Sequence, residues 1–411
     1  MGGFRMRLVG TFFALTMIIA SSLALAQDVP PRERARIERI LRGTPLIDGH
    51  NDLPWAIRDD FASNLDAVDL HADTRTLTPP LHTDFARLSA GGVGAQFWSV
   101  YVPASNRGLD NTRMVLEQID LTRRIIARYP RQLAFAETAD DIVRIHRSRR
   151  IASMLGIEGG DAINSNLALL REFRRAGVTY MTLTHSTTID WVDSATDAPR
   201  HGGLSAFGED VVREMNRIGM FVDLSHVSAD AMRDALRVSA APVIFSHSSA
   251  FAIAHHPRNV PDDVLAMVRD NGGVVMVNFT SPFISEEFRR WSALRGGKQA
   301  EFRALNPGNA GEADRLLLEW TAANPPPRVT PAHVADHVEH IARVAGRAHV
   351  GLGADYDGVT YLPEGMGGVD GYTPLLAELI RRGWSDADIA ALAGGNVLRA
   401  MRAMERVAAR S

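Results

Sequence analysis

Eight short apolar segments, separated by longer segments of helical character, limit the folds open to this 411-residue chain more than any other feature. Most are continuous runs of Val, Ile, Leu and Met, which is typical of parallel strands covered by helices on both faces. They span 46–52, 93–102, 151–158, 178–185, 220–226, 242–247, 273–279 and 349–355. Eight strands alternating with helices predict an α/β protein with a (β/α)8 TIM barrel, and a doubly wound sheet is the competing fold.

The intervening segments with helical periodicity include 109–129, 166–176, 208–218, 228–238 and 261–270. Residues 280–332 do not fit this alternation, and we interpret them as an insertion after the seventh strand. The predicted organisation is therefore one catalytic barrel domain over residues 27–411 with an insertion at about 280–332.

The first 26 residues have the pattern of a secretory signal peptide. Arg5 and Arg7 precede an apolar run over 8–20, and an Ala-x-Ala sequence ends at Ala26. We expect cleavage after Ala26 and an exported, periplasmic or secreted bacterial protein without a stable membrane anchor. An uncleaved membrane anchor is the alternative. The chain has no cysteine, so no disulfide can form.

Composition argues against a nucleic-acid partner. The net charge is −3, and 44 of the 45 basic residues are arginines scattered among 48 acidic residues. No basic run marks a nucleic-acid-binding surface.

Polar side chains of the kinds that bind metals end six of the eight predicted strands. Because the active sites of (β/α)8 barrels lie at the carboxyl ends of the strands, these side chains should meet at one rim. A structural histidine or a capping aspartate explains any one of them, but not all six together. The residues are His50 and Asp52 on the first strand, followed by Glu158, His185, His226, His247 and Asp355.

Imidazole and carboxylate groups without thiolate predict a site for Zn²⁺, with Mn²⁺, Co²⁺ or Fe²⁺ as alternatives. We expect two ions: His50 and Asp52 hold one, His226 and His247 hold the other, and Glu158 bridges them together with a shared water. Two such ions lower the pKa of the water and polarise a carbonyl, which favours hydrolysis of an amide or an ester.

Related barrels often bridge their metals with a carbamylated lysine. The one lysine of this chain, Lys298, falls in the predicted insertion, so that bridge is not available. This strengthens the assignment of the bridge to Glu158.

Three residues are candidate substrate-binding or catalytic groups. His185 is placed to stabilise the oxyanion, although a fourth nitrogen ligand or a packed histidine is the alternative. Asp355 is placed to move a proton from the water to the leaving amine, with Asp357 as its rival. Arg258 is suited to grip a substrate carboxylate, and a surface salt bridge is the competing explanation.

Together the motifs resemble those of the membrane (renal) dipeptidase family, in the same order and over about residues 44–405. Seven linked motifs are far more specific than any one of them. They lie at Asp48–Trp55, Gly156–Gly160, Leu183–Ser186, Asp223–Ser228, Phe245–Ser249, Arg258–Asp263 and Gly353–Gly358.

The resemblance implies a binuclear zinc barrel of the amidohydrolase type that hydrolyses dipeptides, often with a D-residue at the C-terminal position, and in some members opens β-lactam rings. It also implies a homodimer. It carries the metal roles onto the five residues assigned above, and catalytic or substrate roles onto His185, Arg258 and Asp355. The mammalian relatives are linked by disulfides, which this cysteine-free chain cannot form.

The main hypothesis is therefore an exported zinc dipeptidase that acts on dipeptides by attack of a metal-bridging water. A second hypothesis is another binuclear amidohydrolase acting on a β-lactam, a lactone or an N-acyl amino acid; such an enzyme would tolerate loss of Arg258 if it recognises no free carboxylate. A third is a non-catalytic binding protein built on the same barrel.

Overall fold

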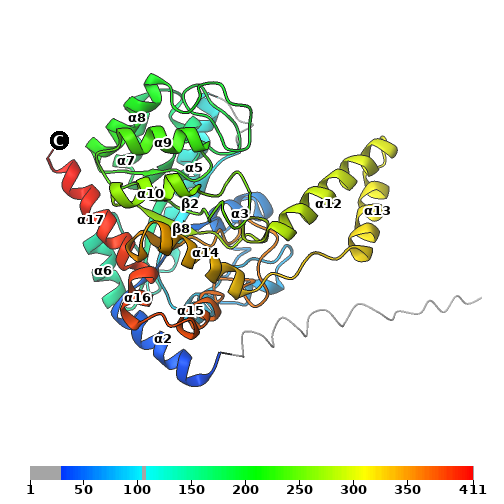
Figure 1. Cartoon of the computed structure of the whole chain (residues 1–411), viewed down its shortest axis with the longest axis horizontal. Helices are drawn as coiled ribbons and strands as arrows, with labels where there is room; N and C mark the ends of the chain where they lie inside the picture. The colour runs from blue at the N-terminus through cyan, green and yellow to red at the C-terminus, as the bar shows by residue number, and fades with distance from the viewer. Residues whose placement is uncertain (1–28, 104–107, 411) are drawn as a thin grey trace, which may run out of the picture.

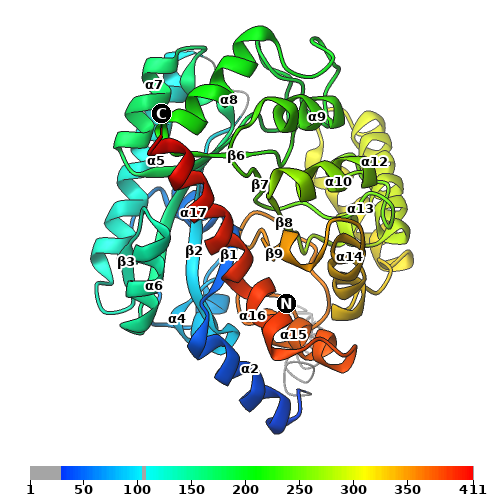
Figure 2. The ribbon, with the colours of Figure 1, turned by 60° about the vertical axis from the view of Figure 1, so that its left-hand side comes forward.

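A computed structural model describes residues 29–103 and 108–410. The predicted signal sequence at 1–26 lies outside these residues. Eight parallel strands close into the predicted barrel (Figures 1 and 2). They are β1 (Leu46–Asn51), β2 (Val93–Tyr101), β4 (Ile151–Glu158), β5 (Val178–Thr182), β6 (Phe221–Asp223), β7 (Ile244–Phe245), β8 (Val274–Val277) and β9 (Val350–Leu352).

Two pairings show that the sheet is closed. Strand β2 pairs with β4 from Ala95–Ala152 to Tyr101–Glu158, and β1 pairs with β9 at Asp48–Leu352. Because β1 also pairs with β2, no edge of the eight-stranded sheet is left open. This closure excludes the doubly wound sheet and confirms the barrel.

A ninth strand, β3 (Leu133–Phe135), was not predicted. It pairs with the first residues of β4, beside the part of β4 that pairs with β5. Helix α6 (Ala139–Arg147) follows it and begins with a capping box at Thr138.

The helices predicted between the strands are present within one or two residues of the expected bounds. They are α5 (Leu109–Arg128), α7 (Leu167–Arg175), α8 (Ala206–Ile218), α9 (Ala229–Val238) and α10 (Asp262–Asn271). Further helices are α2 (Pro31–Gly43), α3 (Leu53–Phe61), α4 (Phe85–Gly91), α14 (Pro331–Val344), α15 (Tyr372–Arg381), α16 (Asp386–Ala390) and α17 (Asn396–Ala408).

The amino-terminal end of the barrel is filled by apolar side chains and covered by the last helix. Figure 2 shows α17 running across this end of the strands. Val397, Met401 and Met404 of α17 belong to the same buried cluster as Ile47 and Val274 at the starts of β1 and β8. The opposite, carboxyl-terminal end is therefore the open end on which a site can be built.

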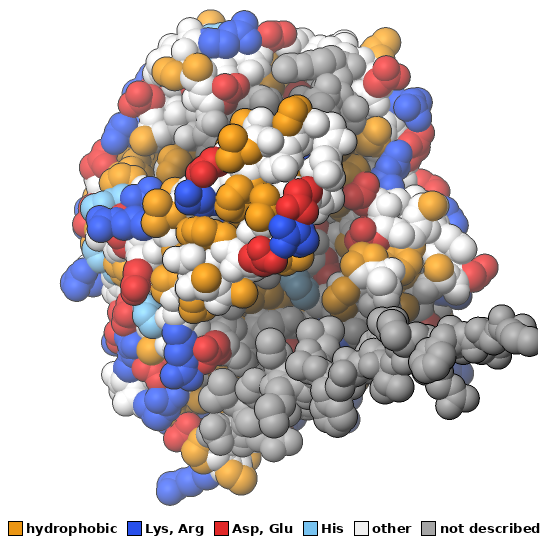
Figure 3. Space-filling view, turned by 90° about the vertical axis from the view of Figure 1, so that its right-hand side faces the viewer, with side chains coloured by type: hydrophobic (Ala, Val, Ile, Leu, Met, Phe, Trp, Pro, Cys, Tyr) orange, Lys and Arg blue, Asp and Glu red, His pale blue; other side chains and the backbone are white. Residues whose placement is uncertain are grey.

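Residues 280–332 contain the short helix α11 (Ser281–Ile284) and a pair of longer helices, α12 (Glu286–Leu305) and α13 (Ala310–Ala323). This α12–α13 hairpin projects from the barrel in Figure 1. Figure 3 looks onto it and shows hydrophobic side chains grouped there beside charged ones. On these two helices, Leu294, Leu305 and Leu318 are each at least 65% exposed. Within the described ranges, no helix combines the length and apolarity that a membrane span requires.

Candidate metal centre

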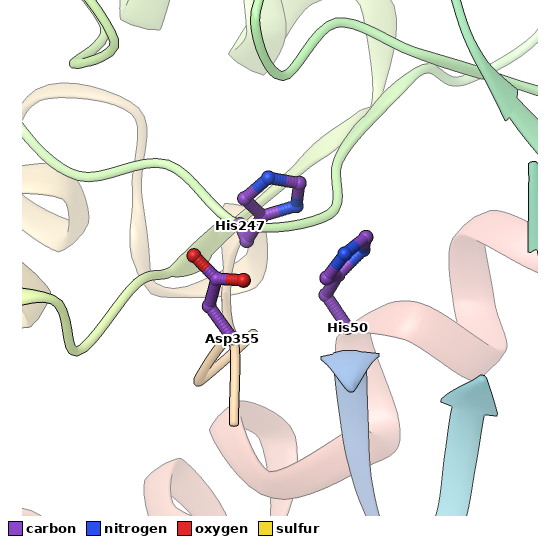
Figure 4. A group of neighbouring side chains, drawn as sticks. All are labelled: His50, His247 and Asp355. Carbon is purple, nitrogen blue, oxygen red and sulfur yellow. The ribbon is translucent and has the colours of Figure 1, made fainter. Parts of the chain in front are cut away.

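The predicted metal-binding side chains meet at the carboxyl end of the barrel, although they come from separate strands. His50 and Glu158 lie in the last positions of β1 and β4, while the other residues follow the ends of their strands by one to three positions. Figure 4 shows His50, His247 and Asp355 converging from three parts of the rim. His226 and Asp355 have φ angles of 71° and 67°, so the chain turns through left-handed backbone where it presents these two side chains.

The two carboxylate oxygens of Glu158 face different groups. Oε2 lies 3.4 Å from Nε2 of His50, which in turn lies 3.3 Å from Oδ2 of Asp52. Oε1 lies 2.9 Å from Nε2 of His226 and 3.5 Å from Nε2 of His247. One carboxylate thus stands between a His–Asp pair and a His–His pair, in the arrangement that the sequence predicts.

The donor atoms suit divalent ions. Three overlapping groups have their potential ligand atoms within 4.8 Å of one another: His50–Asp52–Glu158, Glu158–His226–His247 and His50–His247–Asp355. Nε2 of His50 and Oδ1 of Asp52 are buried and have no hydrogen-bond partner among the described residues. Because burying unpaired polar atoms is costly, a bound cation is the natural partner of these two atoms.

Tyr180 on β5 orients His50. Its hydroxyl lies 2.8 Å from Nδ1 of His50 and 3.3 Å from the carbonyl oxygen of Gly49. If the hydroxyl donates to Gly49, it can accept from Nδ1–H, which leaves the Nε2 lone pair directed at the cluster. The ring of Tyr180 fits because residue 156 is glycine, where an added Cβ would lie 2.0 Å from Cζ of Tyr180.

A second chain of hydrogen bonds orients His247. Oγ of Ser246 lies 2.8 Å from Nδ1 of His247 and donates to Oδ2 of Asp223 at 2.6 Å. Tyr180, Ser246 and Asp223 were not predicted from the sequence to have a role in the site. Asp223 and Ser246 lie in the sequence motifs of His226 and His247, and this proximity is the one sequence signal for their role. Tyr180 looks in the sequence like any aromatic residue of a strand.

The charges in the cluster favour metal binding. Burial lowers the pKa of His226 and of His247 well below the usual value, and the positive charge of Arg258 acts in the same direction. Burial alone would raise the pKa of Glu158, but His50, His185 and the hydrogen bond from His226 outweigh it and lower that pKa well below its usual range. Neutral His226 and His247 beside an ionised Glu158 are in the forms that bind cations. His50 differs: burial acts to lower its pKa, but Tyr180, Glu158 and Asp52 raise that pKa well above the usual value, so a bound cation would take the place of a proton on this ring.

Asp355 lies among the candidate metal ligands, whereas its rival Asp357 does not. Oδ2 of Asp355 accepts a hydrogen bond of 2.9 Å from Nδ2 of Asn278. Burial raises the pKa of Asp355 to about 7, with nearby carboxylates adding to the effect. Oδ1 of Asp357 instead accepts from the backbone N–H of His82 at 2.6 Å, which ties Asp357 to the loop before α4.

His185 and Arg258 border the cluster. Nε2 of His185 lies 3.7 Å from Oε1 of Glu158, and its ring contacts those of His226 and Tyr101 with centroids 4.3 and 4.9 Å apart.

Arg258 is only 3% exposed. Its guanidinium makes long hydrogen bonds of 3.4 Å to Oγ of Ser248 and to the carbonyl of His247, and it forms no ion pair within the described residues. The surface salt bridge considered from sequence is therefore absent there.

Comparison with known proteins gives one consistent result at the level of sequence. Residues 34–411 match the family described as membrane dipeptidase, peptidase family M19. The chain is 38% identical over 386 residues to dipeptidase 3 of Rattus norvegicus, covering 93% of this chain and 69% of the rat protein. It is also 38% identical over 400 residues to dipeptidase verJ of Clonostachys rogersoniana, covering 95% of this chain and 90% of that protein.

Solved structures share the barrel. The probable dipeptidase PvdM from Pseudomonas aeruginosa superposes with a TM-score of 0.76 at 22% identity, over 92% of this chain and 100% of that one. A metallo peptidase from Rhodobacter sphaeroides, bound to a phosphinate mimic of the dipeptide L-Ala-D-Ala, gives 0.70 at 22% identity, over 88% and 99%. At these identities the likeness shows the fold, here the (β/α)8 barrel.

Proposed function

Because the chain belongs to the membrane dipeptidase family, peptidase family M19, we propose that it hydrolyses dipeptides at a pair of divalent metal ions and accepts a D-residue at the C-terminal position. The observation that carries the proposal is the position of Glu158, whose two oxygens face the two groups of candidate ligands.

The donor set suits Zn²⁺, since it combines imidazole and carboxylate groups without thiolate. His50 and Asp52 would hold one ion, His226 and His247 the other, and Glu158 would bridge the two. Bound there, the ions would lower the pKa of a water molecule and polarise the scissile carbonyl. The hydroxyls of Tyr180 and Ser246 hold the rings of His50 and His247 in place.

The remaining residues divide the proton transfer and charge stabilisation between them. Hydrolysis adds the hydroxyl of water to the carbonyl carbon, breaks the C–N bond and delivers a proton to the departing amine. Asp355, held by Asn278, is placed to take the proton from the water and pass it to the amine. His185 lies beside Glu158 and is 20% exposed in its side chain, so it can donate an N–H to the developing oxyanion.

Arg258 supplies the recognition of a dipeptide. A buried guanidinium with two long hydrogen bonds and no carboxylate partner in the described structure is incompletely satisfied. The free C-terminal carboxylate of a dipeptide would complete it with bidentate hydrogen bonds. The L-Ala-D-Ala mimic bound by the Rhodobacter sphaeroides protein motivates the D-residue.

The test is hydrolysis of a panel of matched L,L- and L,D-dipeptides by the full chain. Each rate is measured before chelation, after chelation and dialysis, and after addition of Zn²⁺. A sample carried through the same dialysis without chelator controls for loss of folded protein.

We expect cleavage that disappears on chelation, returns with zinc and includes the L,D-substrates. Cleavage of the L,L-dipeptides alone would overturn the D-residue part of the proposal. A folded, zinc-loaded protein that cleaves no dipeptide would overturn the activity and leave β-lactam, lactone or N-acyl substrates to be tried.

We also propose that the protein is exported and that it forms a homodimer. The pattern of residues 1–26 supports export, and cleavage would leave a mature chain that begins at Gln27. Mass spectrometry of the N-terminus and light scattering of the purified protein test the two statements separately.

A further inference from the structure

A large cavity lies at the opposite end of the barrel from the candidate metal centre. It has a volume of about 1320 Å³ and is lined by residues of α2, α4 and α6 and by the first residues of β2 and β4. Figure 2 shows these three helices along the same edge of the barrel. Because the cavity borders the amino-terminal ends of the strands, a ligand bound there would not contact the candidate metal ligands.

The cavity is strongly basic in a chain whose net charge is −3. Among its lining residues, Glu38 is the single carboxylate, and it lies 4.0 Å from Arg42. The six arginines of this cavity, called here the arginine cavity, are Arg34, Arg42, Arg131, Arg147, Arg149 and Arg150.

Ion pairing does not account for four of these arginines. Arg131, Arg147, Arg149 and Arg150 form no ion pair with any residue in the described ranges, and Arg150 donates only to Oγ of Ser148 and, at 3.5 Å, to the carbonyl of Pro130. By contrast, Arg144, which lies one turn before Arg147 on α6 and does not line the cavity, forms an ion pair with Asp141 at 2.6 Å. Like charges held together without counter-charges repel one another, and a bound anion would relieve that repulsion.

One of the arginines also occupies an unfavourable backbone position. Arg149 has φ of 59°, directly after the C-terminal cap of α6. Helices commonly place glycine at this position because left-handed backbone is strained for residues with a Cβ. An arginine is therefore not the residue that best serves the turn, and it lies in the lining of the cavity.

We propose that the arginine cavity binds a multivalent anion bearing phosphate or sulfate ester groups. Guanidinium groups recognise such groups through paired N–H donors. The volume exceeds the need of a single inorganic ion, and Ile37, Leu41 and Phe85 supply an apolar wall for the organic part of the ligand. A soluble ester and a phospholipid headgroup offer the same chemistry.

The experiment uses the full chain loaded with zinc and two probes. Inositol hexasulfate, titrated by calorimetry, represents a soluble ester; vesicles of phosphatidylglycerol, tested by co-sedimentation, represent a headgroup. The informative variant is Arg149→Gly, which removes one guanidinium and relieves the backbone strain. Arg406→Gln on α17, an exposed arginine that does not line the cavity, is the matched control.

We expect at least one probe to bind the wild type, more weakly as salt is added. Arg149→Gly should lower the affinity about tenfold, keep a midpoint of thermal unfolding at or above that of the wild type, and leave dipeptide hydrolysis unchanged. Arg406→Gln should bind as the wild type does. Binding of vesicles alone would assign the ligand to the headgroup class. The proposal is overturned if neither probe binds, or if Arg149→Gly and Arg406→Gln bind equally well.

Discussion

The hydroxyl of Tyr180 lies 2.8 Å from Nδ1 of His50, although 130 residues separate them in the chain. This contact fixes the ring of a candidate metal ligand from inside the barrel. It depends on a third position, because the ring of Tyr180 passes over the backbone of Gly156 on the neighbouring strand. The candidate metal centre is thus positioned by packing as well as by its candidate ligands.

Gly156→Ala should damage the centre without touching a ligand. The new Cβ would lie 2.0 Å from Cζ of Tyr180, which is fully buried and cannot move freely. We expect the free energy of unfolding to fall by about 1–3 kcal/mol and the zinc content to fall with it. Gly296→Ala on α12 is the control, since an added Cβ there has no atom within 4 Å. A fully metallated Gly156→Ala protein would contradict the positioning role of Tyr180.

Glu158→Gln should lose metal and activity together. The amide keeps the shape of the side chain but removes the charge that both groups of candidate ligands share. Zinc content measured by mass spectrometry should fall below that of the wild type, and kcat/KM should fall by more than about 100-fold. Full metal content with normal turnover would exclude the bridge.

Asp355→Asn should separate metal binding from turnover. The group formed by Glu158, His226 and His247 is intact in this variant, so metal should remain there. An amide cannot accept the proton of the water, and we expect kcat to fall by about 10²–10⁴-fold. Asp357→Asn is the matched comparison because Asp357 binds the loop at His82. A larger loss of kcat in Asp357→Asn would reverse the assignment.

The rim of the barrel could be predicted because each candidate ligand lies at or just after the carboxyl end of an apolar strand, and strand order determines which ends meet. This rule alone predicts that His50 and Glu158 lie close together. The strand β3 was missed because three residues after Pro130 carry too short a pattern to separate from a loop. Several predicted strands were also too long, although β4 has the predicted bounds: β7, for example, ends at Phe245, two residues before His247.

The contacts that orient the ligands could not be predicted. Tyr180 is an aromatic residue in a strand, and the sequence does not say whether its hydroxyl meets His50 or a backbone carbonyl. The space beside Gly156 that holds the ring of Tyr180 is formed only when β4 and β5 pair, so the sequence does not reveal it. The position of Asp355 among the ligands likewise depends on the left-handed turn at that residue.

Arg258→Gln should reveal whether a substrate carboxylate is recognised. For dipeptides we expect a loss of about 100-fold or more in kcat/KM, because the partner of a buried charged pair is removed. The same dipeptides with an amidated C-terminus should be poor substrates for the wild type and lose little further in the variant. Equal losses on both substrates would show that Arg258 supports the fold rather than the carboxylate.

His337 should make stability depend on pH at a point away from the metal centre. It is fully buried on α14; Nδ1 accepts from the backbone N–H of Ala250 at 2.9 Å, and Nε2 donates to the carbonyl of Ile284 at 2.9 Å. Burial lowers the pKa of His337 to about 4. Because the unfolded chain keeps a pKa near 6.5, it binds more protons than the folded chain below that pH, so acid favours unfolding.

The contribution of neutral His337 is therefore present above pH 6.5 and is lost as the pH falls toward 4. Between pH 7 and pH 5 the loss amounts to about 2 kcal/mol. Urea unfolding of the wild type and of His337→Gln at both pH values isolates this contribution. The variant should have the lower free energy of unfolding at pH 7, and its difference from the wild type should be smaller at pH 5. His255→Gln, at an exposed position, controls for removal of a histidine. A gap that stays constant with pH would show that the two hydrogen bonds of His337 survive its protonation.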